Sequence, residues 1–356
     1  MVYTVYRRNI MPNENESRRL QEVGHSTLTI SIPVEHAKAL GLKKGDSMIV
    51  REELDGTLRL IPVEKTQKTT SASIKVDAIE SDELLARMII GCYMLGYDSI
   101  ELASKRGLRA SQINNVTKTM RRLRGVEIVD SSENRMLVQS FMDPTKFPVD
   151  SLIKRLQLLV SRSLDDSVRA LRGESPSVLN EVRRIQQEID ELYWLIVRQL
   201  LVALSNREIS GKIGLESPLH TSGDRVSAKT IEEIGRIILE VTEETINFRE
   251  AGSSVDTDVL GSVERLAHAA GDAFDATMES LLAPEIRTIQ KAMEHIDSAV
   301  NLEREVTTQF VELEYPNLRG IISDFGQIAR YCSIIIEIAL NRLLRKTSRI
   351  CVIQER

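Results

Sequence analysis

Residues 152–171, LIKRLQLLVSRSLDDSVRAL, decide the fold class of the larger part of this 356-residue chain. Leucine, isoleucine and valine recur there every three or four positions, which is the spacing of one face of an α-helix. Comparable spacing continues to residue 345, with breaks at proline, glycine and serine. Aromatic residues make up only 4% of the chain, which fits helices packed through aliphatic side chains. We therefore expect everything from Pro148 onward to be helical.

The helical pattern occurs twice. Six long helices are expected, in two sets of three: 152–171, 176–206 and 227–249, then 257–282, 284–312 and 316–345. Between the second and third helices, residues 207–225 carry Gly, Pro and Ser and are expected to form a loop. The second helices of the two sets start 284 − 176 = 108 residues apart, as an internal duplication would place them. Two three-helix bundles, at 148–252 and 253–350, are the expected packing.

Towards the amino terminus the period changes from helical to extended. Residues 26–33, STLTISIP, alternate between apolar and polar and predict a strand that ends at Pro33. A short helix is expected at 34–40, then a turn at 43–46 and a hairpin over 47–62 with its turn at Asp55-Gly56. Residues 1–66 contain few large apolar side chains, so a dimer is the simplest way to complete their core. The polar stretch 66–73 is expected to be a linker.

Residues 74–147 mix helix and strand. Helices are expected at 82–95, capped by Gly96, and at 111–123, with Ser111 as N-cap. Strands at 126–129 and 135–141 are joined by the turn SSEN, so the order is strand, helix, helix, hairpin. This order predicts a small α+β unit. The whole chain is thus expected to be an α+β multidomain protein, with a small β domain, the α+β unit, and a mostly α part of two repeated bundles.

Composition excludes several classes of protein. No window approaches the 18 consecutive apolar residues of a membrane span, and the first residues lack a signal-peptide core, so we expect a cytoplasmic protein without membrane insertion. The three cysteines, Cys92, Cys332 and Cys351, lie far apart and lack metal-ligand spacing, which argues against disulfides and structural zinc. The sequence has no phosphate-binding loop, nucleophile elbow or zinc-protease motif, so we expect no enzyme and no cofactor.

Charge is unevenly distributed along the chain. Residues 1–145 carry 21 Lys+Arg against 19 Asp+Glu, a balance of +2, and the remainder carries 26 against 33, a balance of −7, which together give −5. Seven cations fall within residues 101–124 against one acid: Lys105, Arg106, Arg109, Lys118, Arg121, Arg122 and Arg124. They form a candidate second basic surface for nucleic acid. The alternative is a solvated helix face balanced by acids elsewhere, such as Asp98 and Glu127, because no aromatic residues are interleaved to stack on bases.

The first segment resembles the AbrB/MazE-type swapped-hairpin DNA-binding family. The resemblance rests on RRLQEVGHST at 18–27, TISIP at 29–33, LKKGD at 42–46 and DGTLRLIP at 55–62. It implies an interlocked homodimer that binds duplex DNA through the following residues: Arg18, Arg19, His25, Lys43 and Lys44. Guanidinium groups and exposed turn amides suit phosphates and guanine edges. The alternative is a dimerisation module without DNA binding, since residues 1–65 carry 10 basic and 9 acidic side chains.

Residues 148–346 resemble the PhoU family, the regulators of phosphate uptake. In the first bundle, QEIDELY at 187–193 and KTIEEIGR at 229–236 are similar to the family's conserved acidic segments. In the second bundle, GQIARYC at 326–332 falls at the matching place. The resemblance implies sites where carboxylates spaced i, i+4 on one helix face converge on a metal ion.

These family positions are degenerate here, so we expect no metal. Gln186 stands four residues before Asp190, where a carboxylate would complete the pair. Arg236 and Arg330 stand where the family has an aspartate, and only Asp190 and Glu232 are retained in the first bundle. A guanidinium at a ligand position inverts the local electrostatics.

We hypothesise that the two arginines replace the metal by pairing with nearby acids. Arg236 is expected to contact both retained carboxylates of the first bundle, and Arg330 to contact Glu305 or Asp297 in the second. The alternative is that the correspondence is shifted by one helical turn, which leaves both arginines at the surface.

Together the two resemblances imply an architecture seen in archaeal PhoU-family regulators of phosphate uptake. They imply a dimeric transcription regulator that links phosphate status to duplex DNA. The alternative is an adaptor that uses its first segment only to dimerise and docks through its bundles on a phosphate transporter's ATPase or a sensor. A chromatin protein without sequence preference is a weaker hypothesis, because the first segment is nearly neutral.

Overall fold

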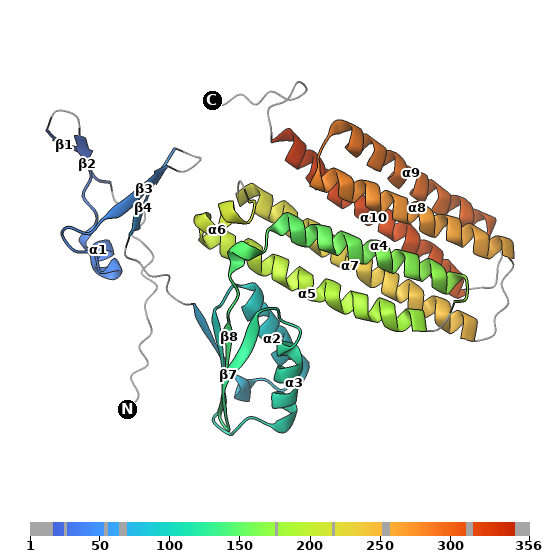
Figure 1. The fold of residues 1–356 in the computed structure, drawn as a ribbon, viewed down its shortest axis with the longest axis horizontal. Coiled ribbons are helices and arrows are strands. Elements are labelled where there is room, and N and C mark those ends of the chain that lie inside the picture. Colours follow the sequence, from blue (N-terminus) through green and yellow to red (C-terminus); the bar gives the residue numbers. More distant parts are fainter. Residues whose placement is uncertain are drawn as a thin grey trace. The chain divides into compact units, whose positions relative to one another are not determined.

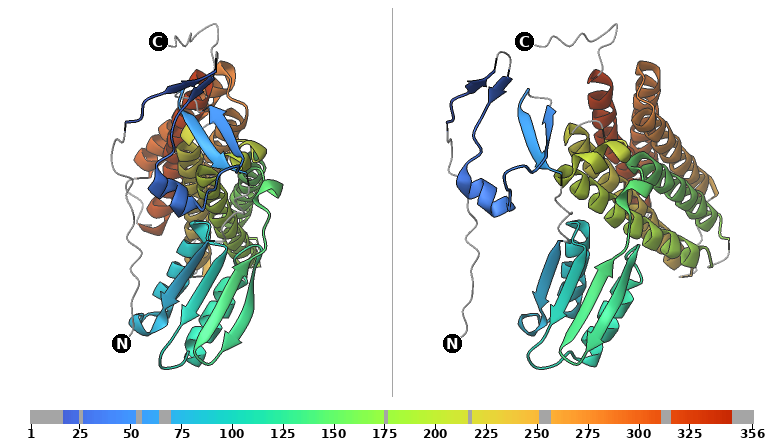
Figure 2. Two further views of the ribbon diagram at one scale, coloured as in Figure 1. Left: turned by 90° about the vertical axis from the view of Figure 1, so that its left-hand side faces the viewer. Right: turned by 60° about the vertical axis from the view of Figure 1, so that its left-hand side comes forward.

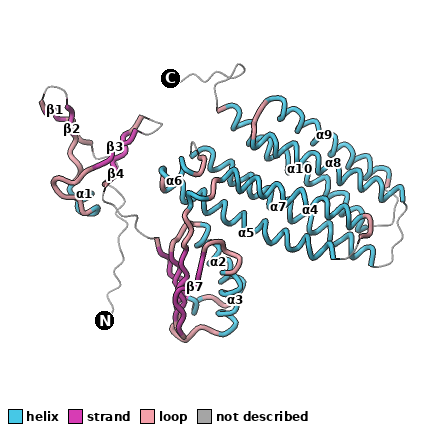
Figure 3. The backbone as a smooth tube through the Cα atoms, viewed as in Figure 1, coloured by secondary structure: helices cyan, strands magenta, loops and turns pink. Residues whose placement is uncertain are grey.

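The computed structural model describes residues 17–24, 27–52, 56–63, 70–174, 177–215, 218–250, 257–310 and 316–345. The chain forms two compact units, Met1–Lys68 and Thr69–Arg356. Figure 1 labels most of the elements of both units, and Figure 3 separates helix, strand and loop by colour.

The first unit contains two short antiparallel hairpins and one helix. β1 (Gln21–Val23) pairs with β2 (Thr27–Thr29), and β3 (Met48–Glu52) pairs with β4 (Leu58–Pro62). Between them, α1 (Val34–Leu40) ends at Gly41, whose φ of 67° is a left-handed conformation that glycine adopts without strain. The strand predicted at 26–33 stops at Thr29, because its partner β1 begins at Gln21, the residue opposite Thr29, and Pro33 serves instead as the N-cap of α1. His25, Ser26 and Asp55 lie outside the described residues.

The described part of this first unit has no buried core. None of its described residues is buried, and its large apolar side chains are exposed: Leu20, Val23, Leu28, Ile30, Val34, Ile49, Val50, Leu58, Leu60 and Val63. An isolated two-stranded hairpin is at best marginally stable in water. The first unit therefore depends on a further surface to bury these side chains.

The second unit begins with a four-stranded sheet covered on one face by two helices (Figure 2). Its elements are β5 (Ser71–Lys75), a 3-10 turn (Val76–Ala78), α2 (Asp82–Met94), β6 (Ser99–Ala103), α3 (Ala110–Met120), β7 (Val126–Ser132) and β8 (Arg135–Ser140). The strand order is β5-β6-β8-β7, parallel between β5 and β6 and antiparallel elsewhere. The buried residues Leu85, Ile89 and Tyr93 of α2 pack on the sheet.

Three details of the α+β unit differ from the sequence prediction. β6 was missed because SIELA offers only two buried positions, Ile100 and Leu102, which is too short for a clear alternation. α3 begins at Ala110 rather than after Ser111, because the backbone N–H of Arg109 donates to the Gln112 side chain (3.0 Å) and starts the helix earlier. Residues 71–73 belong to β5 and not to a linker, since pairing with β6 outweighs their polar composition.

Long helices make up the rest of the second unit as it is described: α4 (Val149–Leu171), α5 (Ser177–Ser205), α7 (Pro218–Glu250), α8 (Thr257–Leu282), α9 (Ile286–Gln309) and α10 (Pro316–Leu344). α4, α5 and α7 pack together, as do α8, α9 and α10. The two sets also touch, α7 against α10 and α4 against α8, so they share one hydrophobic core. None of the helices in the described ranges is long and apolar enough to cross a bilayer.

The loop predicted at 207–225 is partly helical. Asn206 accepts a hydrogen bond from the backbone N–H of Ile209 (3.4 Å) and caps the short helix α6 (Arg207–Lys212). α7 then begins at Pro218, a residue that the first turn of a helix tolerates. The described Gly, Pro and Ser residues of this stretch therefore lie near the end of α6 and in the first turns of α7, and do not form one long loop.

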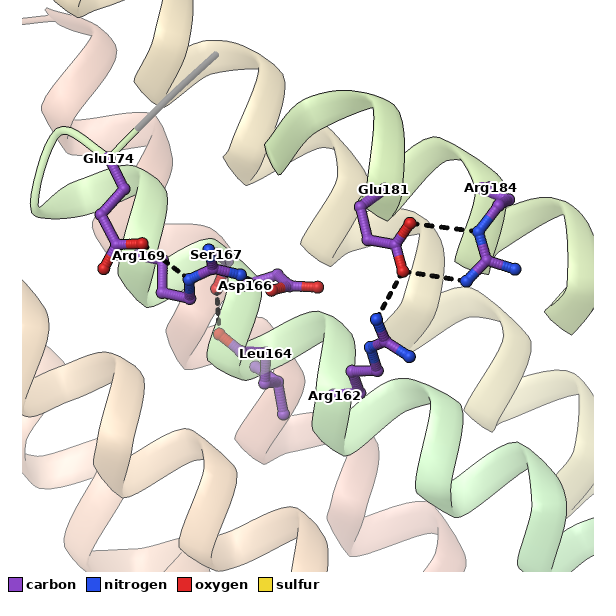
Figure 4. Close-up of polar contacts among 8 residues, drawn as sticks. All are labelled: Arg162, Leu164, Asp166, Ser167, Arg169, Glu174, Glu181 and Arg184. Carbon is purple, nitrogen blue, oxygen red and sulfur yellow. Dashed lines mark hydrogen bonds and ion pairs between the residues drawn. The ribbon is translucent and has the colours of Figure 1, made fainter. Parts of the chain in front are cut away.

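Figure 4 shows how charged side chains are satisfied near the ends of α4 and α5. Glu181 on α5 accepts hydrogen bonds from Arg184 on the same helix (2.9 Å) and from Arg162 on α4 (2.5 Å), and both arginines lower the pKa of Glu181. On α4, the buried carboxylate of Asp166 accepts from Arg169 (2.6 Å). Of these contacts, the one between Arg162 and Glu181 links α4 to α5.

Candidate functional site

Four of the five residues of the first unit that were predicted to contact DNA lie in the described ranges, and all four are exposed. Arg18 and Arg19 precede β1, and Lys43 and Lys44 lie on the turn between α1 and β3. The backbone N–H of Lys43 donates to the carboxylate of Asp46 (2.7 Å), which closes this turn as predicted. Both lysine side chains remain at the surface. His25 lies outside the described residues and is not placed.

The second set of basic residues divides into three groups. Lys105 and Arg106 lie in the loop before α3, which packs on the β7–β8 turn through the Leu108 N–H and the Glu133 carbonyl (2.8 Å). There the carboxylate of Asp77 accepts from the backbone N–H of Lys105 (2.7 Å), and this bond and others hold the pKa of Asp77 below its usual range. Eleven residues of α3, about 16 Å of helix, separate this group from the next. These two groups therefore lie near opposite ends of α3 and do not form one compact cluster.

At the other end of α3, the arginines face acids of α5. Arg122 donates to the carboxylate of Asp190 (3.0 Å), and its guanidinium lies 4.7 Å from the ring centroid of Trp194. Arg124 lies 3.9 Å from both Glu188 and Glu191. Arg122 and Arg124 are thus balanced by acids of α5, and not by Asp98 or Glu127, the two acids that the alternative named.

The remaining members of the set are arranged differently. Arg109 lies 3.8 Å from Asp82 at the start of α2, across the α2–α3 contact. Lys118 and Arg121 are exposed on α3 and on the turn that follows it. These three residues add positive charge to the surface of the α+β unit.

The degenerate family positions of the first bundle meet between α5 and α7. Gln186 donates to Asp190 (2.9 Å) on the same face of α5. On α7, the buried carboxylate of Glu232 is paired with both Lys229 and Arg236. The predicted contact between Arg236 and Glu232 is therefore present, whereas the ion pair of Asp190 is made by Arg122.

Charges around this cluster balance one another. Burial lowers the pKa of Lys229, but its hydrogen bonds to Glu232 and Glu233 outweigh that effect and leave the pKa raised. Burial likewise lowers the pKa of Arg236, and the charges of Glu232, Glu233 and Asp190 outweigh it. Lys229 was missed in the sequence, although its i, i+3 and i, i+4 spacing to the two glutamates was a signal. Arg122 had no such signal, because its contact to Asp190 spans 68 residues.

A glycine allows the close approach of α5 and α7 at this cluster. A Cβ atom built on Gly235 would lie 2.6 Å from Gln186 Oε1 and 2.9 Å from Ile189 Cδ1. Real Cβ atoms do not approach so closely, so a side chain at position 235 would force the ends of Gln186 and Ile189 to move. The side chain of Gln186 thus occupies the space in front of Gly235.

The second bundle repeats this arrangement with another acid. Arg330 on α10 donates to Glu303 on α9 (2.6 Å), and the Glu303 carboxylate fills the space in front of Gly326. The predicted partners Glu305 and Asp297 are wrong because both are exposed, whereas Glu303 lies on the inward stripe of α9 with buried Ala299 and Val306. The hypothesis that a nearby acid pairs with each arginine thus holds, with a different residue in the second bundle.

A further acidic group lies between α7 and α10. Burial raises the pKa of Asp324 to about 6, and the nearby carboxylates Glu244 and Glu240 act in the same direction. Two like charges close to a half-buried carboxyl disfavour its ionised form.

The two degenerate clusters do not fit a divalent cation. No group of three or more His, Cys, Asp or Glu side chains converges in metal-binding geometry in the described ranges. In the first cluster the acids are already neutralised by Lys229, Arg236 and Arg122, and in the second by Arg330. A cation added beside these groups would meet positive charge and not an open set of carboxylates.

Comparison with known proteins finds a family match in each of two parts of the chain. The PhoU domain family matches residues 153–245, and the family described as antidote-toxin recognition MazE, bacterial antitoxin, matches residues 22–68. A search of curated proteins finds no match. Among solved structures, the crystal structure of PhoU from Pseudomonas aeruginosa is 20% identical and is matched over 56% of this chain and 96% of that chain, with a TM-score of 0.42. The first unit therefore matches the MazE family, and helices α4, α5 and α7 match the PhoU domain family.

Proposed function

We propose that this chain is a dimeric, DNA-binding transcription regulator of the PhoU type, without enzymatic activity, that controls phosphate uptake genes in the cytoplasm. The observation that carries the proposal is the first unit. It matches the MazE family over residues 22–68 and exposes the large apolar side chains of both hairpins. A second copy that interlocks with these hairpins would bury them and complete a core.

The dimer also supplies the charge that DNA binding needs. Each copy contributes four described basic residues on exposed segments, Arg18, Arg19, Lys43 and Lys44, so a dimer presents eight. Arginine is suited to bidentate contact with phosphates and guanine, and lysine to phosphate. His25 stays part of the proposal through its place in the family pattern. The link to phosphate uptake rests on the PhoU domain.

A salt titration of full-length protein against its own promoter and a scrambled duplex tests the proposal. The promoter is expected to bind more tightly, with the preference retained at physiological salt. Arg18→Ala combined with Arg19→Ala should abolish the preference and reduce the salt slope by about 0.9 for each phosphate that the variant no longer neutralises. The matched control is Arg51→Ala combined with Arg59→Ala, which removes the same charge from paired positions on β3 and β4.

Equal, weak binding to both duplexes would overturn the DNA-binding proposal. The adaptor function would then be favoured, with the first unit used only to dimerise. That function predicts co-purification of a phosphate transporter ATPase with the intact protein and no change in that association when Arg18 and Arg19 are replaced.

A further inference from the structure

The α+β unit has an open apolar groove at one edge of its sheet. The groove has a volume of about 620 Å³ and lies between β5 and α2. Its apolar lining includes Ala72, Ile74, Leu84, Met88, Cys92 and Leu95. Among the described strands, β5 is an edge strand of the sheet, beside α2 (Figure 2).

The backbone of β5 is able to accept another strand. Alternate residues of a strand direct their N–H and C=O groups to opposite edges. The Thr70 carbonyl accepts from the N–H groups of Asp98 (2.9 Å) and Ser99 (3.1 Å), so Thr70, Ala72 and Ile74 face β6. Ser71, Ser73 and Lys75 therefore direct their backbone groups to the outer edge. An edge of this kind is a template for pairing unless it is covered.

The exposed face of α2 continues the groove. Leu84, Met88 and Leu95 are 50%, 39% and 62% exposed and follow helical spacing along one face. Gly91 lies within the same stripe, and a Cβ built on it would meet nothing within 4 Å among the described atoms. A glycine inside a helix is unfavourable relative to alanine. No described contact within the chain requires a glycine at position 91. A glycine there would, however, allow the surface of another molecule to pack closely against α2.

We propose that a second copy of this chain covers the groove, with β5 pairing antiparallel to β5 of the partner and the two α2 stripes packing against each other. A two-fold axis perpendicular to the sheet places the helices of both copies on the same face, so the same operation joins the strands and the helices. The proposal rests on the dimer of the first unit. Eight residues, 63–70, join β4 to β5 and span at most about 28 Å, so a dimer held at its first units keeps its two β5 strands at high effective concentration.

Cysteine cross-linking of the full-length protein tests this interface. Ser73→Cys is introduced in a background with Cys92→Ala and Cys351→Ser, and a short thiol cross-linker is added. We expect a cross-linked dimer as the main product. The matched control is Glu127→Cys. Position 127 is exposed on β7, at the other edge of the same sheet, and its yield of cross-linked dimer should be at least about tenfold lower than that of Ser73→Cys. Adding Leu84→Glu to Ser73→Cys should reduce cross-linking to the control level, because it places a charge in the helix contact.

Light scattering on the same samples separates the two proposals. A dimer that cross-links no better through Ser73→Cys than through Glu127→Cys overturns the β5 interface and leaves the dimer of the first unit in place. A monomeric mass overturns both. A cross-linked product heavier than a dimer shows that the edge joins separate dimers, which overturns the shared axis.

Discussion

Replacing Arg198 with methionine removes a charged side chain of α5 that hydrogen-bonds to the backbone of the α+β unit. The Arg198 side chain is only 6% exposed and donates through Nη1 to the carbonyls of Tyr93 (2.7 Å) and Tyr97 (3.0 Å), near the end of α2. Its guanidinium also lies 5.0 Å from the Tyr93 ring centroid and 3.9 Å from Asp98. Burial lowers the pKa of Arg198, and the charges of Tyr93 and Asp98 oppose that shift.

The size of the effect follows from these contacts. A hydrogen bond from a charged donor contributes about 1.5–3 kcal/mol, and the substitution leaves two carbonyls without this donor. Methionine retains the apolar stem, so most packing is kept. We expect a loss of about 3–5 kcal/mol in the free energy of unfolding of the second unit. For a unit of this size that corresponds to a fall in Tm of roughly 6 °C or more.

Calorimetry on the full-length protein measures this change, and Arg184→Met is the matched control. Arg184 lies on the same helix, its side chain is 58% exposed, and its pairing with Glu181 (2.9 Å) is worth at most about 0.5 kcal/mol. Hydrogen exchange should also quicken at residues 93–98 in Arg198→Met alone. A fall in Tm no larger than that of the control would refute the reasoning, because it would show that water satisfies the two carbonyls equally well.

Three further outcomes are expected. A double-mutant cycle between Arg122→Ala and Asp190→Asn should give a coupling energy of about 1 kcal/mol in denaturant unfolding, and a value near zero would show that the pair is fully screened. Gly235→Ala should lower Tm, because the added Cβ would contact the Gln186 side chain. At Gly261 an added Cβ contacts nothing within 4 Å, so Gly261→Ala should raise the free energy of unfolding by up to about 1 kcal/mol. Equal changes in Tm for the two variants would contradict this reasoning. Because the pKa of folded Asp324 is raised to about 6, the folded state binds its proton more tightly than the unfolded state, and stability is gained as pH falls through 6. Asp324→Asn should therefore raise Tm above pH 6 and lose that advantage towards pH 4, and a pH-independent difference would rule out this cause.

Local features of the fold were predictable from the sequence because interactions between residues close in the chain determine them. The apolar period of α4, the boundaries of α1 with its glycine stop, and the β3–β4 hairpin depend on residues close in sequence. The same holds for the contact of Arg236 with Glu232, four residues apart on one helix. Such reasoning could not find β6 or the start of β5. Residues 71–73 are small and mostly polar, and they form a strand because they pair in parallel with β6, which lies 28 residues further along the chain.

The sequence by itself determined the division into a small β unit, an α+β unit and a duplicated helical part, because composition and period differ between them. Only the tertiary structure decided which charges meet. Arg122 reaches Asp190 across 68 residues, and Glu303 replaces the predicted partners of Arg330 because helix rotation turns it inward. A helical period indicates which residues share a face, but the faces that come together are set by packing of the whole core.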